Sequence, residues 1–191
     1  VPAAETLSPA AQVLFFYYLY QRESELYISK VPLAYTPMTI SRAARQLVQT
    51  GLFQERKDGV QKVLFSLLSP KELFLRMRPR LINPVRERGF LPAAEVNEAF
   101  YEAGESALAQ RTMLNRPAIP CYAVDGKNRR VLHPCDVELG KYAAVELWRY
   151  DPKMLSKDGM VDSLSLIVSL DAADERLEIE IEELLNKTLE E

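Results

Sequence analysis

Cysteine and histidine are scarce in this chain of 191 residues, which holds Cys121, Cys135 and His133 as its only members of either type. Two thiols and one imidazole make a poor metal site, and a chain of this length does not need a disulfide for stability. We therefore expect free, structural thiols in an intracellular protein. Acid–base catalysis near neutral pH often uses His, whereas a single His in an expected loop is more often structural.

Long apolar runs are also missing from the sequence. No stretch approaches the ~18 residues that a membrane span requires. No basic start, apolar run and small-residue cleavage site marks a signal peptide. These absences predict a soluble, cytoplasmic protein.

The motifs of common enzyme classes are absent as well, since the sequence has no P-loop, GxGxxG, GxSxG or HExxH. The dense carboxylates of 175–183 (ERLEIEIEE) face several directions on a helix, so a solvated acidic surface is a better interpretation than a metal site. Trp148 and Tyr150 lie on one face of an expected strand and are assigned to the core rather than to a ligand pocket. We expect no catalytic residues, no cofactor and no metal.

Opposite charges separate along the chain. Residues 1–90 contain 13 Lys and Arg against 7 Asp and Glu, whereas residues 91–191 contain 11 against 20. The two parts therefore carry +6 and −9, and the whole-chain charge of −3 hides a basic N-terminal part. Local positive charge is what a surface needs to bind nucleic acid.

Start and stop signals divide residues 1–90 into short elements. Ser8-Pro9 and Thr36-Pro37 each combine a capping hydroxyl with a proline suited to the first helical position, and Asp58-Gly59 is a strong hairpin signal. The expected elements are an apolar helix at 10–22, a strand at 25–29, a short irregular helix at 31–35, a helix at 37–50, strands at 52–55 and 61–66, and a basic helix at 71–81. This order predicts a winged helix-turn-helix with a linker helix.

The segment 37–50 (PMTISRAARQLVQT) has the spacing of an amphipathic helix. Residues at i, i+3, i+4 and i+7 predict a buried stripe, which consists of Ile40, Ala43, Ala44 and Leu47. The opposite face carries Met38, Arg42, Arg45 and Gln49, flanked by Thr39, Ser41 and Gln46. An ordinary surface helix has the same pattern. The hairpin signal after Gly51 favours instead a recognition helix that enters the DNA major groove.

The candidate DNA-binding residues form two groups. Those of the helix are Thr36, Met38, Thr39, Ser41, Arg42 and Arg45, and those of the wing are Arg56, Lys57 and Lys62. Arg pairs well with guanine, while Thr, Ser and Met suit methyl or phosphate contacts, and a basic wing reaches the minor groove or the backbone. A solvated turn explains the wing residues equally well. For the basic residues from Arg76 to Arg88, pairing with the acidic second part is favoured, and phosphate contact is expected only for those that face the recognition helix.

Residues 91–191 mix helix and strand signals. The expected elements are helices at 93–103 and 105–114, strands at 121–124, 130–132 and 145–150, a segment at 161–170 that fits either a strand or a helix capped by Asp162, and an acidic helix at 171–190 capped by Asp171. The chain is therefore predicted to be α+β. We expect a winged-helix DNA-binding domain at 1–90 and a small mixed α+β domain at 91–191 for dimerisation, sensing or interaction.

The stretch 27–64, above all TPMTISRAARQLVQTGLF, resembles the helix-turn-helix and wing of MarR-like bacterial transcriptional regulators. The resemblance implies that Thr39, Ser41 and Arg42, which match the family's cluster at the start of the recognition helix, touch DNA. The chain departs from the family at Val31-Pro32, where the first helix of the motif normally runs regularly. The later segments NPVRERGF, GESALAQRTML, VELWRYDPKML and VDSLSLIVSL resemble bacterial regulators that join a winged helix to an α+β domain, and distantly AbiEi-like antitoxins.

These observations predict a non-catalytic, sequence-specific binder of double-stranded DNA that regulates transcription. We expect a homodimer, because one winged helix reads too few bases, and an affinity that falls as salt rises. The alternative is a protein-interaction module in which the winged helix is a scaffold and residues 91–191 bind a partner, as an antitoxin binds its toxin. A third version keeps DNA binding and adds a small-molecule effector site within 91–191.

Overall fold

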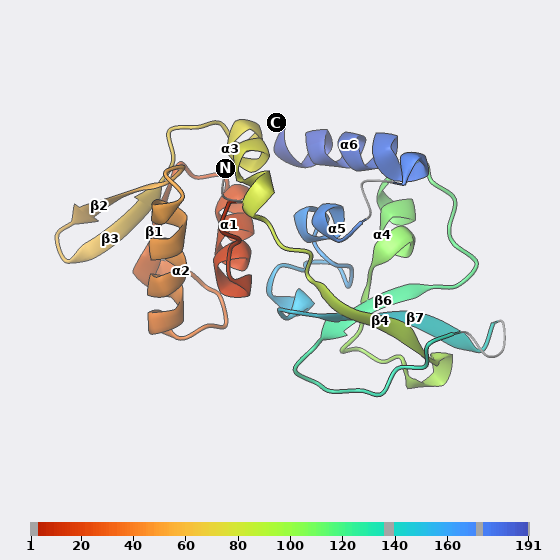
Figure 1. The fold of residues 1–191 in the computed structure, drawn as a ribbon. Helices are drawn as coiled ribbons and strands as arrows, with labels where there is room; N and C mark the ends of the chain where they lie inside the picture. Colours follow the sequence, from red (N-terminus) through yellow and green to blue (C-terminus); the bar gives the residue numbers. More distant parts are fainter. Residues whose placement is uncertain (1–3, 136–139, 171–173, 191) are drawn as a thin grey trace. The chain divides into compact units, whose positions relative to one another are not determined.

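The structure is a computed structural model that describes residues 4–135, 140–170 and 174–190. It is mixed α+β, with six α-helices and two β-sheets in the described residues (Figure 1). The chain divides into two compact units. Unit 1 runs to Ile82 and includes Leu189 and Glu190, and unit 2 runs from Asn83 to Thr188. None of the described helices combines the length and the hydrophobicity that a membrane crossing needs.

The division falls earlier than the boundary between residues 90 and 91 that the sequence suggests. That boundary lies inside strand β4 (Val85–Pro92), which pairs along its length with strand β7 (Tyr142–Trp148). Strand β4 therefore belongs to the sheet of unit 2. Local signals did not indicate this strand, because its partner lies far along the chain.

Helix α1 (Pro9–Gln21) begins where the capping signal predicts. The Ser8 hydroxyl accepts a hydrogen bond from the Ala11 amide at 3.1 Å. The helix is buried on most sides because its aromatic side chains pack in the core of unit 1 against Phe53 and Phe74. The predicted apolar helix is confirmed.

The short helix predicted at 31–35 is not formed, so that expectation is wrong. Strand β1 (Glu25–Tyr27) leads into a single 3-10 turn at Ile28–Lys30, and bends follow it. Pro32 explains the difference, because a proline disfavours the α conformation of the residue before it. Val31 accordingly has an extended backbone, with φ −68° and ψ 119°.

Helix α2 (Pro37–Gln49) presents the stripe that the spacing predicts. Its buried residues are Ile40, Ala43, Ala44 and Leu47. The Thr36 side chain caps the helix by accepting a hydrogen bond from the Thr39 amide at 3.2 Å. Gly51 follows with φ +79°, the left-handed conformation that ends helices and that glycine adopts without steric cost. The prediction for this helix is confirmed.

A hairpin of β2 (Gln54–Asp58) and β3 (Gln61–Phe65) follows α2. Strand β3 lies between β1 and β2, and the whole sheet is antiparallel. The residues of β2 are all exposed, whereas Val63 and Leu64 of β3 are buried. The hairpin is therefore attached to unit 1 through β3 and presents β2 to solvent.

Helix α3 (Pro70–Met77) is shorter than the basic helix predicted for 71–81. The Ser69 hydroxyl caps its start by accepting a hydrogen bond from the Glu72 amide at 3.3 Å. A 3-10 turn at Arg78–Arg80 replaces its last part. Pro79 accounts for the earlier end, because it lacks the amide hydrogen that an α-helix needs.

The sheet of unit 2 has the strand order β4-β7-β6-β5. Strand β6 (Cys121–Asp125) runs parallel to β7, while β4 and β5 (Tyr101–Glu102) run antiparallel to their neighbours. Its helices α4 (Gly104–Arg111), α5 (Ser163–Ser169) and α6 (Glu175–Leu189) lie on one side of the sheet (Figure 1). On the opposite face of the sheet, a buried core is formed by Leu91, Phe100, Val124, Val145 and Leu147.

Residues 93–103 do not form the predicted helix, and this expectation is wrong. They form a 3-10 turn at Ala93–Glu95, an irregular segment and the short strand β5. Burial of Phe100 and pairing of β5 with β6 outweigh the local helix preference. The strand predicted at 130–132 is also wrong, since His133 instead makes an isolated bridge with Phe90.

Other expectations for this region are confirmed. The Asp162 carboxylate accepts a hydrogen bond from the Ser165 amide at 3.0 Å, so the ambiguous segment 161–170 holds a capped helix, α5. Trp148 and Tyr150 are buried, and their rings meet edge to face with centroids 5.6 Å apart. Asp171, the expected cap of the last helix, lies outside the described residues.

Candidate nucleic-acid interface

The exposed face of α2 carries residues that the sequence assigns to DNA binding. Met38 is 62% exposed, and Ser41, Arg42 and Arg45 are exposed as well. This orientation is fixed by the stripe on the opposite side, because rotation of the helix would bring Leu47 into water. The rigid core of unit 1 therefore holds this face outward.

Thr36 and Thr39 organise the start of α2. Their hydroxyl oxygens lie 2.9 Å apart, and the Thr36 oxygen also accepts the Thr39 amide. Thr36 is exposed and Thr39 is half-buried. The first amides of a helix attract anions such as phosphate. Thr36 and Thr39 therefore fix the start of α2, and they also lie at the edge of its exposed face.

Arg42 and Arg45 have no carboxylate partner among the described residues. Among the ion pairs of the described residues, none involves either guanidinium. A guanidinium that is exposed and unpaired has all its donors available for bidentate contacts with guanine or phosphate. The two arginines are therefore suited to contact a nucleic acid.

Gln46 has a structural role beside this face. Its side-chain oxygen accepts a hydrogen bond from the Ser8 amide at 2.9 Å, and its nitrogen donates to the Thr6 carbonyl at 3.2 Å. The side chain is consequently occupied in fixing the segment that leads into α1. The sequence pattern alone places it on the flank of the polar face and does not reveal this role.

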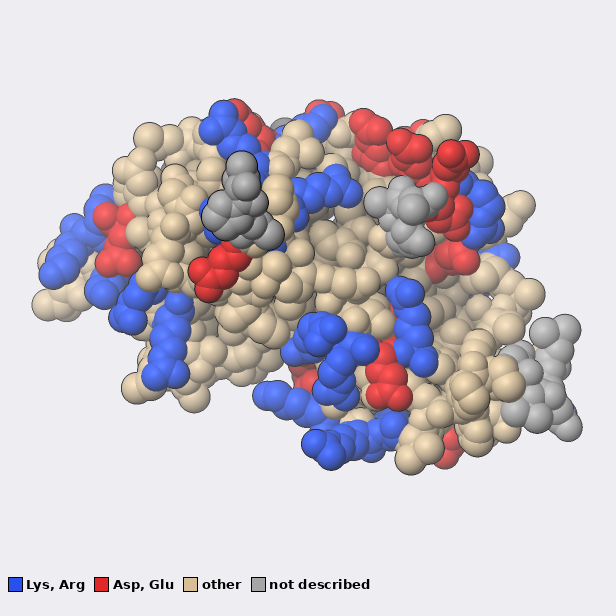
Figure 2. Space-filling view, in the orientation of Figure 1, with Lys and Arg blue, Asp and Glu red and all other residues tan. Residues whose placement is uncertain are grey.

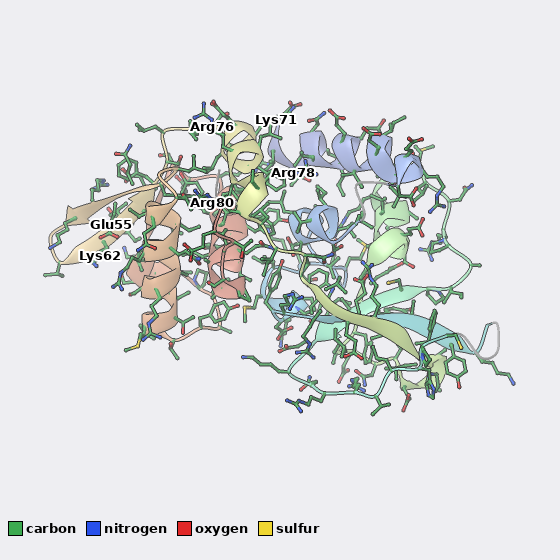
Figure 3. The ribbon with its side chains drawn as sticks, in the orientation of Figure 1. Glu55, Lys62, Lys71, Arg76, Arg78 and Arg80 are labelled. Atoms are coloured by element: carbon green, nitrogen blue, oxygen red, sulfur yellow. The ribbon has the colours of Figure 1, made fainter. Side chains whose placement is uncertain are left out.

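The predicted wing residues differ in their surroundings. Arg56 makes a bidentate pair with Glu25, with Nε–Oε1 at 3.1 Å and Nη2–Oε2 at 2.5 Å. Lys62 lies 3.7 Å from the Glu55 carboxylate, and Figure 3 shows both side chains on the hairpin. Lys57 is exposed and belongs to no ion pair of the described residues. Two of the three cations of the predicted wing therefore have a carboxylate partner.

The basic residues of α3 and the following turn have partners of their own (Figure 3). Arg76 pairs with Glu72 at 2.7 Å, one helical turn away, and Lys71 pairs with Glu190 at 2.6 Å. Arg78 stacks over the Phe74 ring. These side chains therefore already contact carboxylates or an aromatic ring, which argues against a DNA contact. The sequence pattern led to the same expectation.

Unit 2 contains a cavity of about 420 Å³ over the helix-facing side of its sheet. Mostly apolar side chains line it, with the pair Arg88–Glu146 in its wall. Glu146 accepts hydrogen bonds from Arg88 Nε and Trp148 Nε1, each at 3.1 Å. Burial raises the pKa of the Glu146 carboxyl, although Arg88 acts against this. An ion pair in the wall of a mostly apolar cavity is a feature of small-molecule sites.

The described residues offer little for metal or thiol chemistry. No group of three or more His, Cys, Asp or Glu side chains among them is arranged to hold a metal ion. Cys121 and Cys135 are free thiols. Burial raises the pKa of Cys121 well above its usual value, so this thiol stays protonated and unreactive.

Comparison with known proteins gives no relative for this chain: no family model, no curated protein and no solved structure matches it.

Proposed function

We propose that the chain is a sequence-specific double-stranded DNA-binding transcriptional regulator in which unit 1 acts as a winged helix. In this proposal α2 enters the major groove and the β2–β3 hairpin lies beside it as the wing. The observation that supports it best is the outward face of α2. This face presents Arg42 and Arg45 unpaired, opposite a buried stripe that fixes the helix.

The exposed residues make different kinds of contact with DNA in this proposal. Arg42 donates to guanine, while Met38 and Ser41 contact thymine methyl groups or phosphates. Arg45, one turn further along, and Lys57 on the hairpin contact the backbone. Arg56 and Lys62 contribute less, because breaking their ion pairs with carboxylates offsets part of the free energy gained from a phosphate contact.

A single recognition helix reads few bases, so a second copy of the chain is required for specificity. We propose a homodimer on a two-fold site whose half-sites are about 10 base pairs apart. Most of the affinity comes from phosphate contacts and falls as salt rises. 

The test is selection of duplex fragments by the intact protein and by the Arg42→Ala variant. The wild type is expected to enrich one motif, and the variant is expected to lose preference at one position in each half-site, at a cost of about 1–3 kcal/mol in discrimination. Arg76→Ala is the matched control, because it removes an exposed arginine that already pairs with Glu72. Enrichment of the same motif by Arg42→Ala would show that the assignment is wrong.

A protein-interaction module is the second candidate, and two observations favour it. Two of the three wing cations already pair with carboxylates, and the exposed side of α6 is acidic, with Glu178, Glu182 and Glu183 exposed. In that case unit 1 is a scaffold and unit 2 binds a basic protein partner. A mobility shift on random duplex DNA at low salt separates the two candidates, because the scaffold gives no shift.

The cavity at Arg88 and Glu146 supports a ligand-gated form of the DNA-binding proposal. A small molecule with an apolar body and one hydrogen-bonding group fits its lining. Thermal unfolding in the presence of metabolite pools tests this, because a ligand that binds the native state raises the Tm.

A further inference from the structure

The strand order of unit 2 brings basic residues together at one end of its sheet. Strands β6 and β7 are parallel and finish side by side, and β4 begins at the same end, since Val85 and Asp125 both pair with Trp148. The residues next to these strand ends include four cations from three separate segments: Arg86, Lys127, Arg129 and Arg149. We call these four residues the strand-end basic surface.

Backbone carbonyls orient two of these side chains. Arg86 Nη2 donates to the Gly126 carbonyl at 2.9 Å, and Arg149 Nε donates to the Asn83 carbonyl at 3.3 Å. Gly126 permits the first contact, because a Cβ there would lie 2.5 Å from the Trp148 carbonyl oxygen and 3.2 Å from the Arg86 guanidinium. A carbonyl holds a guanidinium in place without cancelling its charge.

The four cations also lack carboxylate partners. All four are exposed, and none takes part in an ion pair of the described residues. The nearest carboxylate in sequence, Asp125, accepts the Lys127 amide at 3.0 Å and shapes the turn. Three basic residues of unit 1 differ in this respect, since Arg56, Lys62 and Arg76 each pair with a carboxylate.

Charge is therefore segregated within unit 2, although its part of the chain is acidic overall. Figure 2 shows Asp and Glu gathered over α6, while Lys and Arg gather in a separate region of the unit with a few Asp or Glu side chains beside them. An uncompensated group of exposed guanidinium and ammonium groups without an aromatic cage or apolar groove matches the repeated phosphates of a nucleic-acid backbone.

We propose that the strand-end basic surface binds phosphates of duplex DNA and adds sequence-independent affinity to the recognition made by α2. This inference rests on the proposed DNA-binding function. It gives unit 2 a role in DNA binding, although this part of the chain is acidic overall.

The experiment measures the salt dependence of binding to a random-sequence duplex and to a duplex bearing the selected motif. The test variant is Lys127→Ala/Arg129→Ala/Arg149→Ala in the intact chain, which leaves Arg86 and its packing on Gly126 in place. The control variant, Arg116→Ala/Lys157→Ala/Lys187→Ala, removes the same charge from exposed positions elsewhere in unit 2. Melting temperatures of both variants establish that they fold.

Each phosphate contact contributes about 0.9 to the slope of log affinity against log salt, so the test variant is expected to lose about 2.7 from that slope on both duplexes. When the salt concentration rises fourfold, the fold-loss of affinity is therefore expected to be roughly 40 times smaller for the test variant than for the wild type. The charge-retaining variant Arg129→Lys/Arg149→Lys is expected to keep the wild-type slope.

Equal slopes for the test and control variants, with wild-type DNA binding intact, would overturn this inference and leave the proposed function standing. Absence of duplex binding by the wild type would overturn both. A reduced slope in the test variant, with an unchanged sequence motif, supports a backbone-binding role for unit 2.

Discussion

At the scale of single residues, the partners of each cation matter more than its residue type. Arg42, Arg56 and Arg76 are all exposed arginines of unit 1, but the second and third are bound to carboxylates. An arginine that already has a carboxylate partner gives up that interaction when it meets a phosphate. This distinction concentrates the proposed recognition on α2.

Gln46→Ala tests the structural role of a polar residue beside the recognition face. The substitution removes the hydrogen bonds to Ser8 and Thr6 and is expected to lower the free energy of unfolding by about 1 kcal/mol. Chemical denaturation measures this loss. The selected DNA motif is expected to be unchanged, so an altered motif would instead make Gln46 a DNA-reading residue.

Glu146 gives unit 2 a defined pH dependence. Burial raises the pKa of this carboxyl in the folded state, so its contribution to stability is fully present below its unfolded pKa and is lost as pH rises through the folded value. Glu146→Gln removes this dependence. Denaturation across pH 4–8 measures the free energy of unfolding of both proteins. The amount by which the wild type exceeds the variant is expected to decrease as pH rises.

The outcome that contradicts this assignment is an advantage that grows with pH. It would mean that Arg88 stabilises the ionised carboxylate by more than burial destabilises it. The buried amide of the Gln variant still accepts the Trp148 hydrogen bond, so loss of that contact does not confuse the comparison.

The candidate site was predictable from the sequence only where neighbours in sequence determine it. The stripe of α2 follows from the helical period, and this period also places Arg42 and Arg45 outward. The pairing of Arg56 with Glu25 joins residues 31 positions apart and depends on the sheet order. No local pattern reveals that two cations of the predicted wing have carboxylate partners.

At the scale of elements, the capping signals were reliable guides. Ser8, Thr36 and Asp162 each cap a helix as their sequence context predicts, and Ser69 caps α3 in the same way. Strand β4 was not predicted and the segment 93–103 was wrongly predicted to be a helix, because pairing with β7 and β6 determines these segments. Local propensity loses to tertiary pairing in such segments.

Thr36→Ala tests how the start of α2 is coupled to binding. Loss of the cap is expected to cost about 1 kcal/mol of stability and to weaken DNA binding, because the first turn of α2 loosens. Ser69→Ala is the matched control, since it removes the equivalent cap from α3. It is expected to cost similar stability and to leave DNA affinity unchanged, as measured by denaturation and by a binding titration.

A different result locates the function elsewhere. If Ser69→Ala weakened DNA binding as much as Thr36→Ala, the effect would come from the stability of unit 1 as a whole. The start of α2 would then have no special part in binding.

At the scale of the whole molecule, charge averages conceal the surfaces that matter. The chain carries −3 in total, and its residues 91–191 carry −9, yet each unit has exposed cations outside any ion pair of the described residues. Their presence in both units supports the proposed electrostatic binding of DNA by both units.

The most direct test is equilibrium binding of the intact chain to a labelled random-sequence duplex as salt is varied. We expect binding at about 50 mM salt and a loss of affinity of well over roughly 40-fold by 200 mM, with a linear log–log dependence. Arg42→Ala/Arg45→Ala is expected to reduce the slope. No binding at low salt, or an affinity that does not change with salt, would contradict the account.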